Sequence, residues 1–123
     1  MLVADGAARA WFTRIMTNRP NIARVLVDGV EVSRDHDLGA EPSFEFETDE
    51  GNRYRVVAED TPRRQTWTVT RSDGAEEIPA GTVRHDKPWL IFGSSAHHYF
   101  PPGSRVAAGF QNDLWNAVQS LAV

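Results

Sequence analysis

Hydrophobic and polar residues alternate over most of the segment 23–92. Because successive side chains of a strand point to opposite faces, this alternation is typical of strands that bury one face. Three tight-turn sequences interrupt it: Asp28-Gly29, Asp49-Glu50-Gly51 and Asp73-Gly74. The pattern predicts an antiparallel meander of about six to seven strands across residues 23–92.

For the hairpin around Asp49-Glu50-Gly51, the side chains on both faces predict the same register. A three-residue loop with Gly51 in the left-handed position places aromatic and aliphatic side chains on one face and opposite charges on the other. A shift of one residue would set phenylalanine against arginine, which a half-buried sheet resists. The expected pairs are Phe46 with Tyr54 and Phe44 with Val56 inside, and Glu47 with Arg53 and Glu45 with Arg55 outside.

The other two turns predict pairings in the same way. A two-residue loop at Asp28-Gly29 places four valines on one face, and a two-residue loop at Asp73-Gly74 sets the register of a third hairpin. The expected pairs are Val27 with Val30 and Val25 with Val32 in the first hairpin, and Val69 with Ile78, Trp67 with Ala80 and Arg71 with Glu76 in the third.

Amphipathic helices are predicted at both ends of the chain. The first helix is expected over residues 5–17, with Asp5 as its N-cap, and the second over residues 105–121, with Ser104 as its N-cap. Each has apolar side chains three and four positions apart. Between the meander and the second helix, residues 93–103 are predicted to form a loop. The stripes are Ala8, Trp11, Phe12, Ile15 and Met16 in the first helix, and Val106, Phe110, Leu114, Val118 and Leu121 in the second.

Together these elements predict an α+β fold. We expect one domain covering residues 1–123, because a domain usually has about 100–200 residues. Its antiparallel meander is flanked by an N-terminal and a C-terminal amphipathic helix. The sheet is expected to be strongly bent or closed into a small barrel.

Composition narrows the classes of function. The formal net charge is −4, without the basic excess that attracts phosphate backbones, so no nucleic-acid partner is expected. No apolar run approaches the roughly 18 residues that span a bilayer, so no membrane partner is expected either. The chain has no cysteine and no basic leader before an apolar stretch, which favours a cytoplasmic location. Its 12 arginines and single lysine are typical of a GC-rich bacterial or phage genome.

Three of the four histidines, His85, His97 and His98, flank the apolar run at residues 89–92. A metal site needs three or four converging ligands. If residues 89–92 form one strand, four residues at about 3.3 Å each hold His85 more than about 13 Å from the other two. No metal ligand set and no cofactor are therefore predicted.

Two further motifs are weak candidates for catalysis. A serine at 94 or 95 beside His97 or His98 has the elements of a nucleophile–base pair, yet the Gly-x-Ser-x-Gly sequence of hydrolases is absent. The segment Asp35-His36-Asp37 lacks the glycine and terminal glutamate of a calcium loop. No catalytic residue is assigned, and a non-enzymatic role is favoured.

The predicted function is that of a small interaction or accessory protein. It would bind a protein partner, or itself as a homodimer, through a face or an edge of the sheet. The alternative is a small apolar-ligand binding protein, or an enzyme, with a cavity inside a curled sheet and its mouth near 97–99. The ligand-binding candidates are Trp67, Trp89, His97, His98 and Tyr99.

Overall fold

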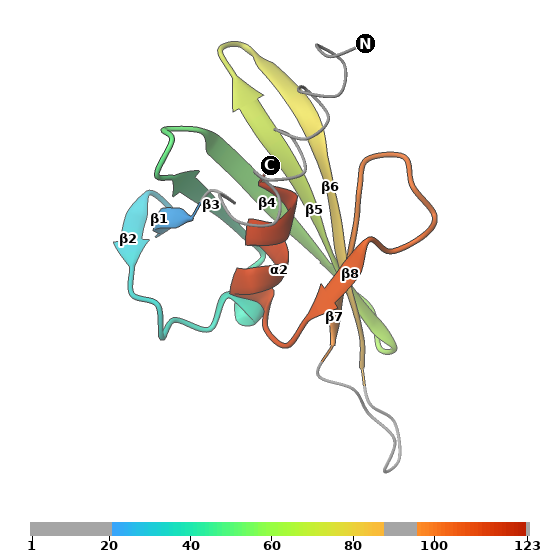
Figure 1. Ribbon diagram of the computed structural model, residues 1–123. Helices are drawn as coiled ribbons and strands as arrows, with labels where there is room; N and C mark the ends of the chain where they lie inside the picture. The colour runs from blue at the N-terminus through green and yellow to red at the C-terminus, as the bar shows by residue number, and fades with distance from the viewer. Residues whose placement is uncertain (1–20, 88–95, 123) are drawn as a thin grey trace, which may run out of the picture.

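The computed structural model of the protein describes residues 21–87 and 96–122. Within them, eight strands form one antiparallel sheet in the order β2-β1-β3-β4-β5-β6-β7-β8 (Figure 1). The chain passes to the next strand of the sheet at every step from β3 onward. The strands are β1 Ile22–Val27, β2 Val30–Val32, β3 Ser43–Thr48, β4 Arg53–Asp60, β5 Arg64–Asp73, β6 Glu76–Asp86, β7 His97–Phe100 and β8 Gly109–Gln111.

One helix, α2 (Leu114–Leu121), lies across one face of this sheet (Figure 1). It contacts β6, β7 and β8, and it also contacts the short 3-10 helix η1 (Leu38–Ala40). We call the covered side the helix face and the opposite side the outer face. Among the described residues, the helix face contains the side chains of Val25, Phe44, Phe46, Tyr54, Val56, Trp67, Val69 and Val83.

The hydrophobic core lies between the helix face and α2. Val56, Val69 and Val83 from the sheet are completely buried, and Val118 from α2 is buried with them. The aromatic rings of Phe46 and Tyr54 stack with their centres 4.8 Å apart. Each large side chain removed from water in this way stabilises the fold by about 1.5–3 kcal/mol. The helix therefore covers the part of the sheet that the alternation marked as buried.

The predicted registers of the first two hairpins are confirmed. Asp28 and Gly29 both have positive φ, as a two-residue type I′ loop requires, and Gly51 has φ +86° in the three-residue loop. In that loop the amide of Gly51 donates to the carbonyl of Thr48. The observed pairs are Val25 with Val32, Val27 with Val30, Phe44 with Val56, Phe46 with Tyr54, Glu45 with Arg55 and Glu47 with Arg53.

The predicted register of the third hairpin is wrong. The two-residue loop is Gly74-Ala75, with positive φ at Gly74 only, which matches a type II′ turn with glycine first. Farther along, the register shifts again at a bulge between Val69 and Thr70. The observed pairs are Asp73 with Glu76, Arg71 with Ile78, Val69 with Gly81 and Trp67 with Val83.

The C-terminal third also differs from the prediction. The expected loop 93–103 contains β7, and the expected helix 105–121 begins only at Leu114, after β8. The helix starts there because the side chain of Asp113 accepts a hydrogen bond from the amide of Asn116, which is the geometry of an N-cap. Val106 and Phe110, which belong to the predicted apolar stripe, are 75% and 60% exposed.

The predicted fold class is therefore wrong. The described structure is mostly one eight-stranded antiparallel sheet with a single C-terminal helix and one 3-10 turn, and not a meander of six to seven strands between two helices. The helix expected at 5–17 and the strand expected at 89–92 lie outside the described residues. None of the helices within 21–87 and 96–122 has the length and apolar character needed to cross a bilayer.

Candidate functional site

The structure divides the predicted ligand-binding residues between the two faces of the sheet. Trp67 on β5 is 1% exposed and lies on the helix face, with its ring centre 5.6 Å from that of His97 on β7. Tyr99 shares this face, since it pairs with Val83. His98 pairs with Arg84 on the outer face. Trp89 lies outside the described residues.

The ring of His85 also contacts that of His97, although the spacing of these residues along the sequence predicted that they lie far apart. The rings of His85 and His97 stack with their centres 4.5 Å apart and their planes 14° apart. The two residues come together because β6 and β7 are adjacent antiparallel strands, in which Arg84 pairs with His98. The backbone carbonyl of Ala96 lies 3.1 Å from Nδ1 of His85. The expected separation of more than about 13 Å, which assumed a single strand, is wrong.

This aromatic cluster is a packing element of the helix face. Stacked imidazoles present their ring faces to each other, whereas metal ligands aim nitrogen atoms at one point. In the part of the chain that the structure describes, no three His, Asp or Glu side chains could hold a metal ion. The indole Nε1 of Trp67 is buried and has no hydrogen-bond partner within 21–87 and 96–122.

The buried aromatic side chains of the helix face share one hydrophobic cluster with the helix. Phe44, Phe46, Tyr54 and Trp67 belong to the same buried cluster as Val118 and other residues of α2. Ligand binding inside the curled sheet stays a prediction.

The outer face carries a second group of residues that the register aligns in one row. Thr66, Arg84, His98 and Phe110 occupy consecutive strands, β5 to β8, and each is paired with the next. The ring of His98 lies 5.9 Å from the ring of Phe110, which is 60% exposed. The row therefore ends at the edge strand β8 with an exposed aromatic side chain beside an imidazole.

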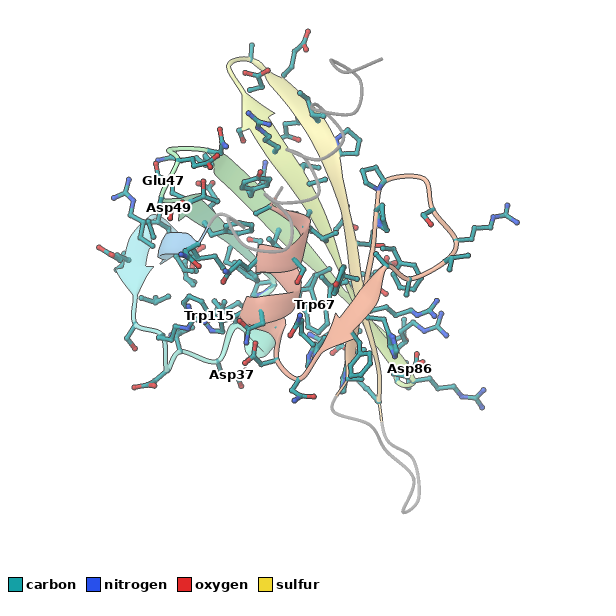
Figure 2. The ribbon with its side chains drawn as sticks, viewed as in Figure 1. Asp37, Glu47, Asp49, Trp67, Asp86 and Trp115 are labelled. Atoms are coloured by element: carbon teal, nitrogen blue, oxygen red, sulfur yellow. The ribbon has the colours of Figure 1, made fainter. Side chains whose placement is uncertain are left out.

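Arginines surround the other end of this row. Arg64 lies next to Thr66 on β5, and its Nε donates a 2.8 Å hydrogen bond to a carboxylate oxygen of Asp86. This hydrogen bond is the main reason why the pKa of Asp86 is below its usual value, although partial burial opposes the shift. Figure 2 shows Asp86 and Glu47 on opposite sides of the molecule, with Trp67 between them.

An open pocket of about 360 Å³ adjoins this end of the row, where β4 turns into β5. Its lining includes Thr66 from the row and Arg63 from the turn. We call the whole surface, from the pocket to Phe110, the outer corner. It consists of Glu59, Thr61, Arg63, Arg64, Thr66, Arg84, His98 and Phe110.

Charge is distributed unevenly between the two halves of the sheet. Residues 21–60, which form β1 to β4, contain eleven acidic and four basic residues, whereas residues 61–122 contain five acidic and six basic ones. Near the outer corner the chain is thus slightly basic, although the whole protein is acidic. Such a separation orients the approach of charged partners over distances of about one Debye length, roughly 8 Å in physiological salt.

Arg84, Phe110 and the pocket are not among the site residues predicted from the sequence. Their alignment depends on the registers of β6 with β7 and of β7 with β8, which the prediction of a loop and a helix over 93–121 excluded. One available signal was the pair His98 and Phe110, each in a short stretch that can alternate as a strand.

No protein-family model, no curated protein and no solved structure matches the chain. A functional conclusion for this protein therefore rests on the chemistry of its own surfaces.

Proposed function

We propose that this chain is a small interaction protein that binds a protein partner through the outer face of its sheet, at the outer corner. The observation that carries the proposal is the exposure of Phe110, in a row with Arg84 and His98, on a face that neither α2 nor η1 covers. Val57, 47% exposed, lies on the same face.

The residue types of the outer corner support protein binding. Aromatic residues and arginine are enriched in the centres of protein interfaces, where a few of them contribute most of the binding free energy. Arg84 already lies against an aromatic ring, with its guanidinium carbon 4.8 Å from the centre of the Phe100 ring. This contact orients the arginine before a partner arrives, which lowers the entropy lost on binding.

The edge strand β8 gives a partner a second means of attachment. Within the described ranges, β8 pairs with β7 on one side only, so its other side can accept a strand of another chain. Phe110 lies on this strand. A partner strand added at β8 would therefore lie beside the exposed ring, next to a separate segment of the partner that crosses the outer face.

Site-specific photo-crosslinking tests the proposal. A benzophenone amino acid in place of Phe110 should crosslink a defined protein in cells of the organism that encodes the chain. The matched control is the same replacement at Val30, which is 65% exposed on the opposite edge strand β2. Equal crosslinking at both positions, or none at position 110, would contradict the proposal.

Light scattering at several concentrations separates the two kinds of partner. A symmetric homodimer is the commonest assembly for a chain of this size, and a second copy is one possible occupant of the β8 edge. A mass that doubles with concentration in the wild type, and that stays monomeric in Phe110→Lys, would identify the partner as the chain itself.

A further inference from the structure

We propose that the partner segment bound at the outer corner is acidic, and that an apolar side chain of the same segment packs on Phe110. This inference rests on the proposed function, since it specifies the chemistry of a partner at that same surface.

Two arginines of the outer corner can form further hydrogen bonds with a partner. Arg84 is half-buried and forms no ion pair in the described part of the chain; its Nε is buried, so its terminal N–H groups are the ones that a partner can reach. Arg63 is exposed and forms no ion pair with any residue of 21–87 or 96–122. A guanidinium group matches the planar shape of a carboxylate, and hydrogen bonds between these charged groups are about twice as strong as neutral ones. Aspartate and glutamate side chains are therefore the groups that this surface is best suited to bind.

One of these carboxylates can bind in the pocket beside Arg63 and Thr66. It is open to solvent, and its volume of about 360 Å³ is sufficient for a side chain of the partner. The acidic residue at its margin, Glu59, makes no ion pair with the described residues and can turn toward the same arginines or away from them. The pocket thus distinguishes the end of the row that receives charge from the end that receives an apolar group.

The geometry of the sheet sets the spacing within the partner segment. Thr66 and Phe110 lie three strand intervals apart, and at about 4.8 Å per interval this is roughly 14 Å. An extended chain rises about 3.3 Å per residue, so its acidic and apolar side chains should be about four residues apart.

The charge distribution favours an acidic protein segment over a nucleic acid. Residues 21–60 repel an acidic partner from the other half of the sheet and so direct it toward the outer corner. Any anionic partner faces Asp86 and the net charge of −4, and this repulsion is greater for a phosphate backbone, which carries a charge at each nucleotide. A short segment with one or two carboxylates avoids most of this repulsion.

A peptide-binding experiment tests the inference on the full-length protein. The probe is a fluorescein-labelled ten-residue peptide with a pair of adjacent glutamates and a single phenylalanine. The second glutamate stands four residues before the phenylalanine. Its controls replace both glutamates with glutamine, or the phenylalanine with alanine. We expect the acidic probe to bind about tenfold more tightly than either control, since each lost contact of this kind corresponds to about a factor of ten.

Paired variants of the protein locate the binding. The double variant R63Q/R84Q should weaken binding of the acidic probe about tenfold or more, and added salt should reduce the difference. The matched control R53Q/R55Q also removes two outer-face arginines, but these are already close to Glu45, Glu47 and Glu77. The R53Q/R55Q variant should change the affinity for the acidic probe less than about twofold. Circular dichroism melting of each variant checks that it is folded.

Several outcomes would overturn the inference. These are equal binding of the glutamine peptide, an equal loss in R53Q/R55Q, no binding of the acidic probe at millimolar concentration, or tighter binding of a single-stranded DNA oligonucleotide than of the acidic probe.

The crosslinking at position 110 separates this failure from failure of the proposed function. If the crosslinked partner segment has no acidic residue near the contact, the inference of an acidic partner is contradicted and the proposed function is not. The same holds for a crosslink to a second copy of the chain. The absence of any specific crosslink at position 110 removes both.

Discussion

The two faces of the sheet use the same strands for different purposes. On β5, Trp67 and Val69 are buried on the helix face, whereas their neighbours Thr66 and Thr68 lie on the outer face and remain accessible to solvent. The free energy of folding therefore comes largely from alternate residues. The remaining residues are free to carry charge and exposed aromatic surface. Substitutions on the two faces should accordingly change different measured quantities.

The largest effect is expected from truncating the core of the helix face. Trp67→Ala removes a side chain that is 1% exposed, and such truncations typically lower the free energy of unfolding by about 3–5 kcal/mol. The matched control is Thr68→Ala, one position along the same strand, which should change it by less than about 0.5 kcal/mol. Urea unfolding measures both. Similar losses in the two variants would contradict the division of roles between the faces.

A second large effect is expected at Gly81, where the backbone has φ +136°. A β-carbon there would overlap the carbonyl oxygen of Phe100 and lie 2.8 Å from a methyl group of Leu121. Gly81→Ala should therefore lower the free energy of unfolding by about 2–5 kcal/mol, through backbone strain and overpacking together. In the control Gly29→Ala, a β-carbon meets no atom within 4 Å, so only the strain of its positive φ applies. If the two variants melt at the same temperature, the close packing at Gly81 is refuted.

A much smaller effect on folding is expected at the exposed end of the outer row. Phe110→Ser should change the free energy of unfolding by less than about 1 kcal/mol, because the ring is already 60% exposed. The same substitution should weaken binding of the acidic probe at the outer corner about tenfold. A loss of several kcal/mol in urea unfolding would show that Phe110 belongs to the core.

The smallest effect concerns the pair formed by Arg64 and Asp86. Because the pKa of Asp86 is lowered in the folded state, the pair stabilises the protein above the pKa of the unfolded state. That stabilisation is lost as the pH falls through the folded-state pKa. At neutral pH, Arg64→Gln should cost less than about 1 kcal/mol, as usual for an exposed pair.

Carboxyl chemical shifts followed by NMR during an acid titration measure this effect. In Arg64→Gln the pKa of Asp86 should rise toward its usual value, while Arg55→Gln should leave it unchanged. An unaltered titration of Asp86 in Arg64→Gln would show that the hydrogen bond does not form in solution.

The sequence predicts the fold best where local turn chemistry and the hydrophobic pattern agree. Asp28-Gly29 and Gly51 specify their loops, and the residues on either side confirm the register. At Asp73-Gly74, two neighbouring two-residue loops were compatible with the glycine, and only contacts with the rest of the sheet select Gly74-Ala75. Short-range signals could not resolve this choice.

The outer corner could not be predicted for a related reason. Phe110 matches a helical stripe as well as it matches a short strand, and the strand forms because β7 provides a hydrogen-bonding partner. Of the predicted site residues, Trp67 and His97 do lie in contact, but nothing in their local sequence indicates that His85 joins them. Pairing between distant segments determines these positions.

The bulge opposite Val69 and Thr70 has a consequence for how the length of this protein can vary in evolution. Val69 pairs with Gly81 and Thr70 with Pro79, so Ala80 is the extra residue and has no counterpart on β5. Loss of Ala80 would leave each cross-strand partner of β5 and β6 unchanged, whereas a deletion elsewhere in β6 would turn the following side chains to the opposite face. Descendants that differ by one residue in this hairpin are therefore expected to gain or lose it at position 80.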